Sequence, residues 1–220
     1  MQIISPKDGF ALSAHHVPAV GQRKGAVVVV QEIFGVTDHI RDICSRFAAQ
    51  GYEALAPSMY DRLEPGFEIK GPVTPEAMEH GRGLMQKTPW DQVGADLQAC
   101  IDRLSGPVFV TGFCWGGAAA WLAATHCNHV TAAAGFYGRA IVSLLGKPPR
   151  APVILHYGKK DPSIPPENIA EVHKAYPAVP LYLYDAGHGF CRENGHDFSA
   201  PARDLALQRT FDFFGAQVKG

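Results

Sequence analysis

Short apolar runs alternate with stretches of helical periodicity along almost the whole chain. The run at residues 26–30 is unbroken, as expected for a strand in the middle of a parallel sheet that is covered on both faces. Further strands are predicted near residues 53–56, 108–111, 130–136, 153–157 and 181–184. Helical patterns lie between them, at residues 37–50, 76–86, 88–104, 118–124, 167–176 and 202–214. This alternation predicts an α/β fold, with a mostly parallel central sheet and helices on both faces.

Three local signals refine this outline. Residues 3–4 and 11–17, separated by Lys7-Asp8-Gly9, predict an opening β-hairpin, because Asp-Gly is a favoured hairpin turn. Residues 58–75 are rich in glycine, proline and charge, and we expect a long surface loop near the functional site. Thr88 is the predicted capping residue of the helix that follows it.

Composition narrows the class of protein. No linker or repeat interrupts the 220 residues, so we expect one domain over residues 1–220. A net charge of −1 offers no basic footprint for nucleic acid and no polybasic patch for a membrane. The N-terminus lacks the features of a signal peptide, and five cysteines without paired spacing suit reduced thiols in a cytoplasm. We therefore expect a cytoplasmic protein, a monomer or weak homo-oligomer, with a small-molecule substrate.

The most informative stretch is Gly112-Phe113-Cys114-Trp115-Gly116-Gly117, which follows a predicted strand and precedes an alanine-rich helix. A residue on a glycine-flanked turn between strand and helix has the layout of a nucleophile elbow, here with cysteine in place of the more usual serine. A helix N-terminus favours the thiolate form of a cysteine, which is the nucleophilic form. A tight turn around a buried cysteine is the alternative, so the partners of Cys114 decide between the two.

Glu32, Asp161 and His188 each follow a predicted strand, as Cys114 does. Active sites in such folds lie at the carboxyl ends of the strands, so we expect these side chains at one sheet edge. Cys114, Asp161 and His188 also follow the order nucleophile, acid, histidine of the α/β-hydrolases. Asp185 is the alternative acid, ranked lower because it is so close to His188 in sequence. Taken singly, either aspartate could be a turn or cap residue, and His188 a solvated loop histidine.

These residues predict acyl-transfer chemistry. His188 would accept the thiol proton, and Asp161 would hold the imidazole in the required tautomer. The thiolate would then attack a carbonyl carbon. The backbone N–H groups of Trp115 and Ile33 would stabilise the resulting oxyanion.

Four motifs carry a resemblance to a known family, and they are Gln31-Glu32-Ile33-Phe34-Gly35, the cysteine elbow, Gly158-x-x-Asp161-Pro162 and Gly187-His188-Gly189-Phe190-x-Arg192. Together they resemble the dienelactone hydrolase (carboxymethylenebutenolidase) family of α/β-hydrolases over essentially the whole chain. The resemblance implies a single-domain α/β-hydrolase fold and a Cys114/His188/Asp161 triad. It implies that a small unsaturated lactone bearing a carboxylate is opened through a thiol acyl-enzyme, without a cofactor. It also implies that Glu32 contacts the resting thiol and helps it lose its proton when substrate binds.

The resemblance suggests substrate-binding residues as well. Arg192 matches the carboxylate-binding arginine of the family, and a second arginine is usual on an earlier helix. Met78 occupies that second place here, and Arg82, one helical turn further on, is our candidate substitute. Tyr137 follows a strand and either lines the site or packs in the core. His126-Cys127-x-His129 lacks a fourth ligand, so no metal site is predicted.

Two alternatives stay open from the sequence. One is a broader carboxylesterase or thioesterase of the same fold whose pocket differs from that of the lactone hydrolases. The other is a non-catalytic protein that uses Cys114 as a redox sensor or a binding residue.

Overall fold

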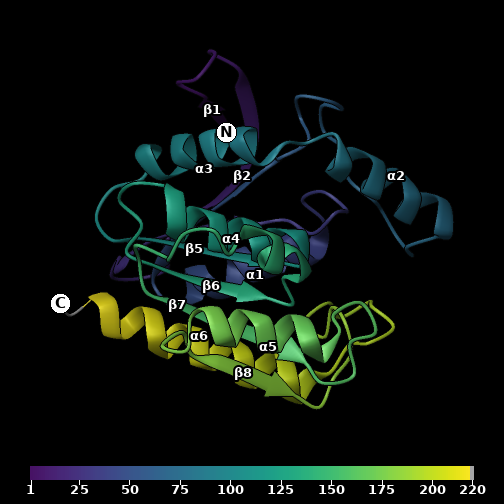
Figure 1. Cartoon of the computed structure of the whole chain (residues 1–220). Coiled ribbons are helices and arrows are strands. Elements are labelled where there is room, and N and C mark those ends of the chain that lie inside the picture. Colours follow the sequence, from purple (N-terminus) through teal and green to yellow (C-terminus); the bar gives the residue numbers. More distant parts are fainter. Residues whose placement is uncertain (219–220) are drawn as a thin grey trace.

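One eight-stranded sheet organises the computed structural model, which describes residues 1–218 (Figure 1). The strand order is β1-β2-β4-β3-β5-β6-β7-β8. The strands from β3 to β8 are parallel, whereas β1 and β2 are antiparallel to their neighbours. Their bounds are β1 (Gln2–Ile4), β2 (Ala11–Val17), β3 (Gly25–Val30), β4 (Tyr52–Pro57), β5 (Val108–Phe113), β6 (Ala132–Phe136), β7 (Val153–Gly158) and β8 (Leu181–Tyr184). The predicted mostly parallel sheet is confirmed.

The helices fall into two groups that cover the sheet. In one group, α1 contacts α6 through Phe47 and Phe211, whose ring centroids are 5.1 Å apart. In the other, Trp90 at the start of α3 stacks on Trp115 at the start of α4, and η1 and α5 follow. Their bounds are α1 (Asp38–Ala49), α2 (Pro75–Gln86), α3 (Trp90–Arg103), α4 (Trp115–His126), η1 (Arg139–Leu144), α5 (Pro166–Ala175) and α6 (Ala200–Val218). Across residues 1–218, no helix is both long enough and apolar enough to span a bilayer.

The junction of β5 and α4 lies at the centre of the molecule. β5 is buried along its whole length between β3 and β6. Helix α4 is buried from Trp115 to Thr125, because its sequence is apolar on every side rather than along one stripe. The residue between these two elements, Cys114, is therefore held by the best-packed part of the fold.

Two local predictions need correction. The hairpin of β1 and β2 is present, but Ile4 pairs with Ala11, so the connection is a six-residue loop rather than a tight Asp-Gly turn. Helix α3 is present too, but its N-cap is Pro89 and no side chain caps it. The Thr88 hydroxyl instead donates a hydrogen bond back to the Leu84 carbonyl, at 2.8 Å, and so closes the end of α2.

Residues 58–87 form the α2 segment. Helix α2 lies at one side of the layered body (Figure 1), whereas Met59 and Tyr60 at the start of the segment are buried in the core. Residues 58–74 form the long loop that we predicted, and α2 follows it. The loop is tied to the body where the Ile69 N–H donates to the Phe34 carbonyl, at 2.9 Å. The helix approaches the body most closely at Gly81, where a Cβ atom would lie 2.4 Å from the Ile33 carbonyl oxygen. Only glycine allows α2 to lie over Ile33 at this separation.

A buried histidine joins the last strands to α6. His156 on β7 is fully buried and hydrogen-bonds the Tyr184 hydroxyl at 2.8 Å and the Thr210 hydroxyl at 3.1 Å. Burial, with a smaller contribution from the nearby charge of Arg209, lowers the pKa of His156 from its ordinary 6.5 to about 3. Both ring nitrogens of the neutral imidazole are thus hydrogen-bonded, and the two bonds link β7 to β8 and to α6.

This network predicts acid-sensitive stability. Between pH 6.5 and about 3 the unfolded chain protonates this histidine while the folded chain does not, so His156 stabilises the fold fully above pH 6.5 and loses that contribution as the pH falls. In urea unfolding experiments from pH 7 to 4.5, the free energy of unfolding of the wild type should fall by up to about 1.4 kcal/mol per pH unit more than that of His156→Gln. Parallel curves for the two proteins would contradict this prediction.

Candidate functional site

The elbow at Cys114 is sharp because β5 and α4 pass each other at very short range. A Cβ atom at Gly112 would lie 2.0 Å from the Gly116 carbonyl oxygen, so no larger residue fits there. Cys114 itself has φ 55° and ψ −118°, a conformation that non-glycine residues rarely adopt. Such strain persists only where the surrounding structure enforces it, and it is concentrated at functional sites. Cys114 stays partly exposed although its neighbours on both sides are buried.

His188 lies between the two partners that the sequence suggested for it. Its Nδ1 atom is 2.6 Å from Oδ2 of Asp161, whose side chain is fully buried. Burial alone would lower the pKa of His188, but the hydrogen bonds and charges of Asp161 and Cys114 outweigh it and raise the pKa to about 10. His188 therefore hydrogen-bonds Asp161 and lies near the Cys114 thiol.

Asp185, the alternative acid, lies elsewhere. Its carboxylate is 2.9 Å from Lys160 Nζ and 75% exposed. That ion pair lowers the pKa of Asp185, with hydrogen bonding to Lys160 as the largest cause. The observed partner of His188 is Asp161, as we expected.

Glu32 and Arg192 approach each other beside the elbow. The Glu32 carboxylate is 2% exposed, and its Oε2 atom is 3.7 Å from Nη1 of Arg192. The guanidinium also lies over the Phe34 ring, 4.8 Å from the centroid, which fixes its plane. Within residues 1–218, Glu32 Oε2 and Arg192 Nε and Nη1 are buried without a hydrogen-bond partner. Two guanidinium nitrogens of Arg192 therefore have no hydrogen-bond partner in residues 1–218, beside a carboxylate that is itself incompletely paired.

The two predicted oxyanion donors lie on either side of this region. Trp115 is the first residue of α4, so its N–H has no carbonyl partner within the helix. Ile33 belongs to the buried turn that follows β3. A Cβ atom at Gly116 would lie 2.4 Å from the Gln31 carbonyl oxygen, which shows how closely the elbow meets the chain leading into that turn.

The two remaining candidates differ in position. Tyr137 is fully buried, has φ 38°, and its ring lies 5.1 Å from that of His188. Arg82 is exposed on α2 and, within the described chain, forms no hydrogen bond or ion pair. The structure thus brings Tyr137 to the histidine, whereas Arg82 faces solvent over at least part of its surface.

Several buried polar atoms without a hydrogen-bond partner lie near the elbow, although one of the set, Ser5, follows the edge strand β1. In residues 1–218 the residues that carry them are Ser5, Glu32, His39, Tyr60, Tyr137 and Arg192. The His39 ring lies 5.2 Å from that of Phe113, and the Tyr60 ring lies 5.4 Å from that of Trp115, so both contact residues adjacent to Cys114 in the chain. Neither His39 nor Tyr60 is among the residues that the sequence suggested. Tyr60 follows β4, so the same strand-end rule that selected Glu32 was the available signal for it.

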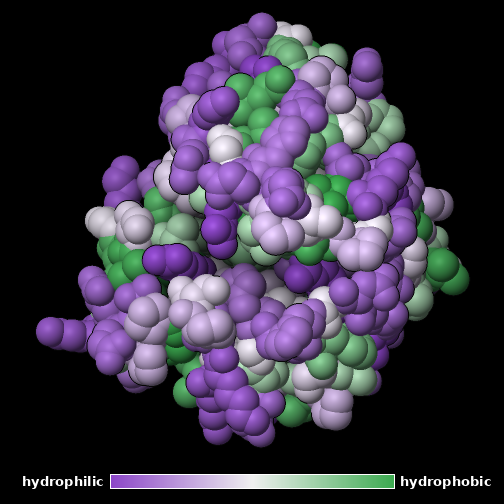
Figure 2. Space-filling model, turned by 90° about the vertical axis from the view of Figure 1, so that its right-hand side faces the viewer, coloured by the Kyte–Doolittle hydropathy of each residue, from purple (hydrophilic) through white to green (hydrophobic). Residues whose placement is uncertain are grey.

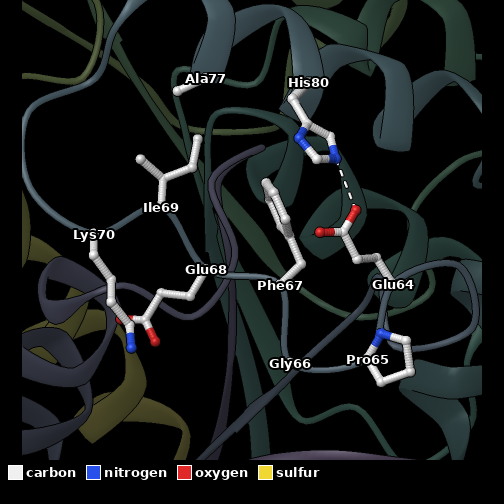
Figure 3. A pocket seen from close by; sticks show the side chains of 9 residues that line it. All are labelled: Glu64, Pro65, Gly66, Phe67, Glu68, Ile69, Lys70, Ala77 and His80. Atoms are coloured by element: carbon white, nitrogen blue, oxygen red, sulfur yellow. Dashed lines mark hydrogen bonds and ion pairs between the residues drawn. The ribbon is translucent and has the colours of Figure 1, made fainter.

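The face to which the parallel strands point is mostly hydrophilic, with a crevice across its middle (Figure 2). A separate hollow of about 460 Å³ lies on the α2 segment (Figure 3). Its lining residues all fall between Glu64 and His80, and the His80 ring is 2.7 Å from the Glu64 carboxylate across it. None of the predicted site residues lines this hollow, so it is distinct from the site at Cys114.

The Asp161 contact predicts the titration of His188. In Asp161→Asn the raising effect of the carboxylate is lost while burial remains, so the pKa of His188 should fall markedly from about 10. In Asp185→Asn, which removes an exposed carboxylate, the pKa of His188 should not change. Ring-proton chemical shifts across a pH series measure both. An unchanged pKa in Asp161→Asn, or an equal fall in Asp185→Asn, would contradict the arrangement described here.

Comparison with known proteins gives a consistent assignment. The model of the dienelactone hydrolase family matches residues 12–218. "Putative carboxymethylenebutenolidase" of Escherichia coli K12 is 35% identical over 233 residues, which cover 95% of this chain and 84% of that protein. "Carboxymethylenebutenolidase" of Pseudomonas putida is 33% identical over 199 residues, which cover 85% of this chain and 84% of that protein.

Solved structures agree with this result. A crystal structure from Klebsiella pneumoniae, titled as a putative dienelactone hydrolase, superposes with a TM-score of 0.84 and 31% identity over 98% of this chain and 97% of its own. A dienelactone hydrolase-like promiscuous phosphotriesterase from metagenomic libraries, at 20% identity and a TM-score of 0.75, shares the fold over 99% of this chain and 97% of its own. The chain therefore belongs to the dienelactone hydrolase family, has the α/β-hydrolase fold, and is a hydrolase that acts on ester bonds.

Proposed function

We propose that this hydrolase uses Cys114 as its nucleophile and opens the ester bond of a small, carboxylate-bearing unsaturated lactone. The single observation that carries the proposal is the place of His188, which hydrogen-bonds Asp161 and lies near Cys114 at a strained elbow. An imidazole between a thiol and a buried carboxylate is the arrangement that activates a nucleophile. The family and its carboxymethylenebutenolidase relatives support the substrate class.

The reaction proceeds in two halves. The Cys114 thiol gives its proton to His188, and the sulfur attacks the lactone carbonyl carbon. The oxyanion that forms accepts hydrogen bonds from the N–H groups of Ile33 and Trp115. The ester C–O bond then breaks, and the leaving oxygen takes a proton from the His188 imidazolium. A water molecule, which gives a proton to His188, attacks the thioester carbonyl. The C–S bond breaks, the thiolate re-forms, and the ring-opened acid leaves.

Glu32 has a role before the first bond forms. Its buried Oε2 atom has no hydrogen-bond partner within residues 1–218 and lies 3.7 Å from Nη1 of Arg192. A substrate carboxylate that binds the guanidinium competes for that positive charge and leaves Glu32 a stronger base. Glu32 then helps the thiol to lose its proton, so binding of an anionic substrate promotes formation of the nucleophile.

Arg192 is the proposed carboxylate anchor. Its guanidinium is held against the Phe34 ring, and within residues 1–218 its Nε and Nη1 atoms have no hydrogen-bond partner, so the group keeps donors for a substrate carboxylate. Tyr137, whose buried hydroxyl also lacks a partner in residues 1–218, completes the polar lining beside His188. No step of this mechanism requires a cofactor.

One observation favours a broader esterase as the second candidate. Met78 and Met85 of α2 are partly buried against the core, whereas Arg82 is exposed. A methionine-bearing helix beside the site suits neutral, apolar ester groups better than a second carboxylate contact does. A preference for neutral esters would then replace the preference for anionic lactones.

Replacement of the thiol tests the mechanism. Cys114→Ala should lose about a thousandfold or more in kcat on p-nitrophenyl acetate, because the attacking group is gone. Cys127→Ala is the matched control, since it removes a thiol at the other end of α4 and should keep its activity. Turnover by Cys114→Ala at the wild-type rate would overturn the proposal and leave a redox or binding role for this cysteine.

Replacement of Arg192 tests the substrate class. Arg192→Ala should lose roughly 10- to 100-fold in kcat/KM on a carboxylate-bearing dienelactone, the range expected for a hydrogen bond to a charged group, and little on p-nitrophenyl acetate. Arg103→Ala, at the exposed C-terminal end of α3, is the charge-matched control. Equal losses on both substrates would favour the broader esterase. Arg82→Ala, assayed alongside, shows whether that second cation contributes.

A further inference from the structure

Tyr60 is held beside the site by a buried glutamine. It lies in the loop after β4 and is 1% exposed. The preceding residue, Met59, donates its N–H to the Gln31 side-chain oxygen at 3.0 Å. The Gln31 side-chain nitrogen in turn donates to the Glu32 carbonyl oxygen at 3.3 Å. The loop that carries Tyr60 is thus fastened to the chain that leads into Ile33.

The Tyr60 ring packs against two aromatic rings, one in the elbow and one in the loop that bridges to the Ile33 turn. On one side, its centroid is 5.4 Å from that of Trp115, the residue after Cys114. On the other side, it is 5.9 Å from that of Phe67. Glu68, the next residue, bridges to Gly35 in the turn that contains Ile33. Tyr137 lies instead against His188, so the two phenols contact different residues around the nucleophile.

The Tyr60 hydroxyl is buried and, among residues 1–218, has no hydrogen-bond partner. A buried hydroxyl without a partner destabilises a fold, and replacement by phenylalanine would remove that cost. Burial raises the pKa of Tyr60, and the nearby Cys114 raises it further, so the group stays a protonated donor over the working pH range. A fixed donor beside a nucleophile, with no structural use, suits an oxygen that the substrate brings.

We propose that the Tyr60 hydroxyl is a third hydrogen-bond donor to the substrate carbonyl oxygen, beside the N–H groups of Ile33 and Trp115. This inference rests on the proposed function, since it assumes an ester carbonyl at Cys114. Tyr60 transfers no proton, and its hydrogen bond strengthens as negative charge develops on the oxygen. Because an oxyanion forms in acylation and again in deacylation, the hydroxyl accelerates both halves of the reaction.

The test is Tyr60→Phe compared with Tyr52→Phe. Tyr52 begins β4, so this control removes the same oxygen from a buried phenol at the opposite end of the same strand. In stopped-flow assays with p-nitrophenyl acetate, Tyr60→Phe should slow both the burst and the steady-state phase by roughly tenfold or more, with KM little changed. Its melting temperature should equal or exceed that of the wild type. Tyr52→Phe should keep both rates.

Several results would overturn the inference. These are wild-type rates in Tyr60→Phe, an equal loss in Tyr52→Phe, slowing of the burst phase alone, or a lower melting temperature that accompanies the loss. If Tyr60→Phe does not fold, 3-fluorotyrosine at position 60 keeps the hydroxyl as a stronger donor, and a fall in its rates would count against the inference. Failure here is separate from failure of the proposed function, because an inactive Cys114→Ala with an unimpaired Tyr60→Phe refutes only the role of Tyr60.

Discussion

The structure depends on the close passage of β5 and α4 at Cys114. Gly112, Gly116 and Gly117 meet backbone atoms so closely that a Cβ atom at any of them would collide. The passage also forces Cys114 into an unfavourable backbone conformation. That strain is held in place because β5 is buried along its length and α4 on every side from Trp115 to Thr125. A rigid core thus keeps one thiol partly exposed where a helix N-terminus begins.

Stability and function are distributed unequally across the sheet. On the side of β7, β8 and α6, His156 satisfies both ring nitrogens with neighbouring hydroxyls, and the group serves the fold. At the carboxyl ends of the strands, Glu32, Tyr60, Tyr137 and Arg192 are buried with polar atoms that stay unpaired within residues 1–218. Such groups cost stability, and they are kept where a substrate can use them. The second positive φ value near the site, at Tyr137, follows the same pattern.

Much of the fold, the elbow and the acid partner of His188 could be predicted from the sequence. The strands and helices follow from strong periodicity, and the elbow follows from glycine spacing that few other structures require. Asp161 could be ranked above Asp185 because Asp185 is so close to His188 in sequence, and the 2.6 Å contact between Asp161 and His188 agrees. The predicted Asp-Gly hairpin turn and the predicted Thr88 cap of α3 were wrong. Local turn and cap preferences are weaker than the strand register and helix packing of the elements that they join.

Other features depended on contacts that no local pattern encodes. Tyr60 lies in an aperiodic loop, and its place beside Trp115 follows from the hydrogen bonds of Gln31 rather than from its own neighbours. Helical spacing groups Arg82 with Met78, but the orientation of α2 is set where Gly81 meets Ile33. That contact buries Gly81 and leaves the following residue, Arg82, exposed. The role of Arg82 stays a prediction.

The way α2 rests on the body has an evolutionary consequence. Most of the proposed catalytic groups follow strands of the sheet, whereas residues 62–87 rest on the body through backbone contacts such as those at Gly81 and Ile69. Substitutions at the exposed positions of residues 62–87 can therefore accumulate without disturbing the reactive centre, whereas Met59 and Tyr60 are buried beside it. We expect relatives that share this scaffold to differ in the substrates they accept before they differ in reaction chemistry. Gly81, where α2 crosses Ile33, should be the position of α2 that is least free to vary.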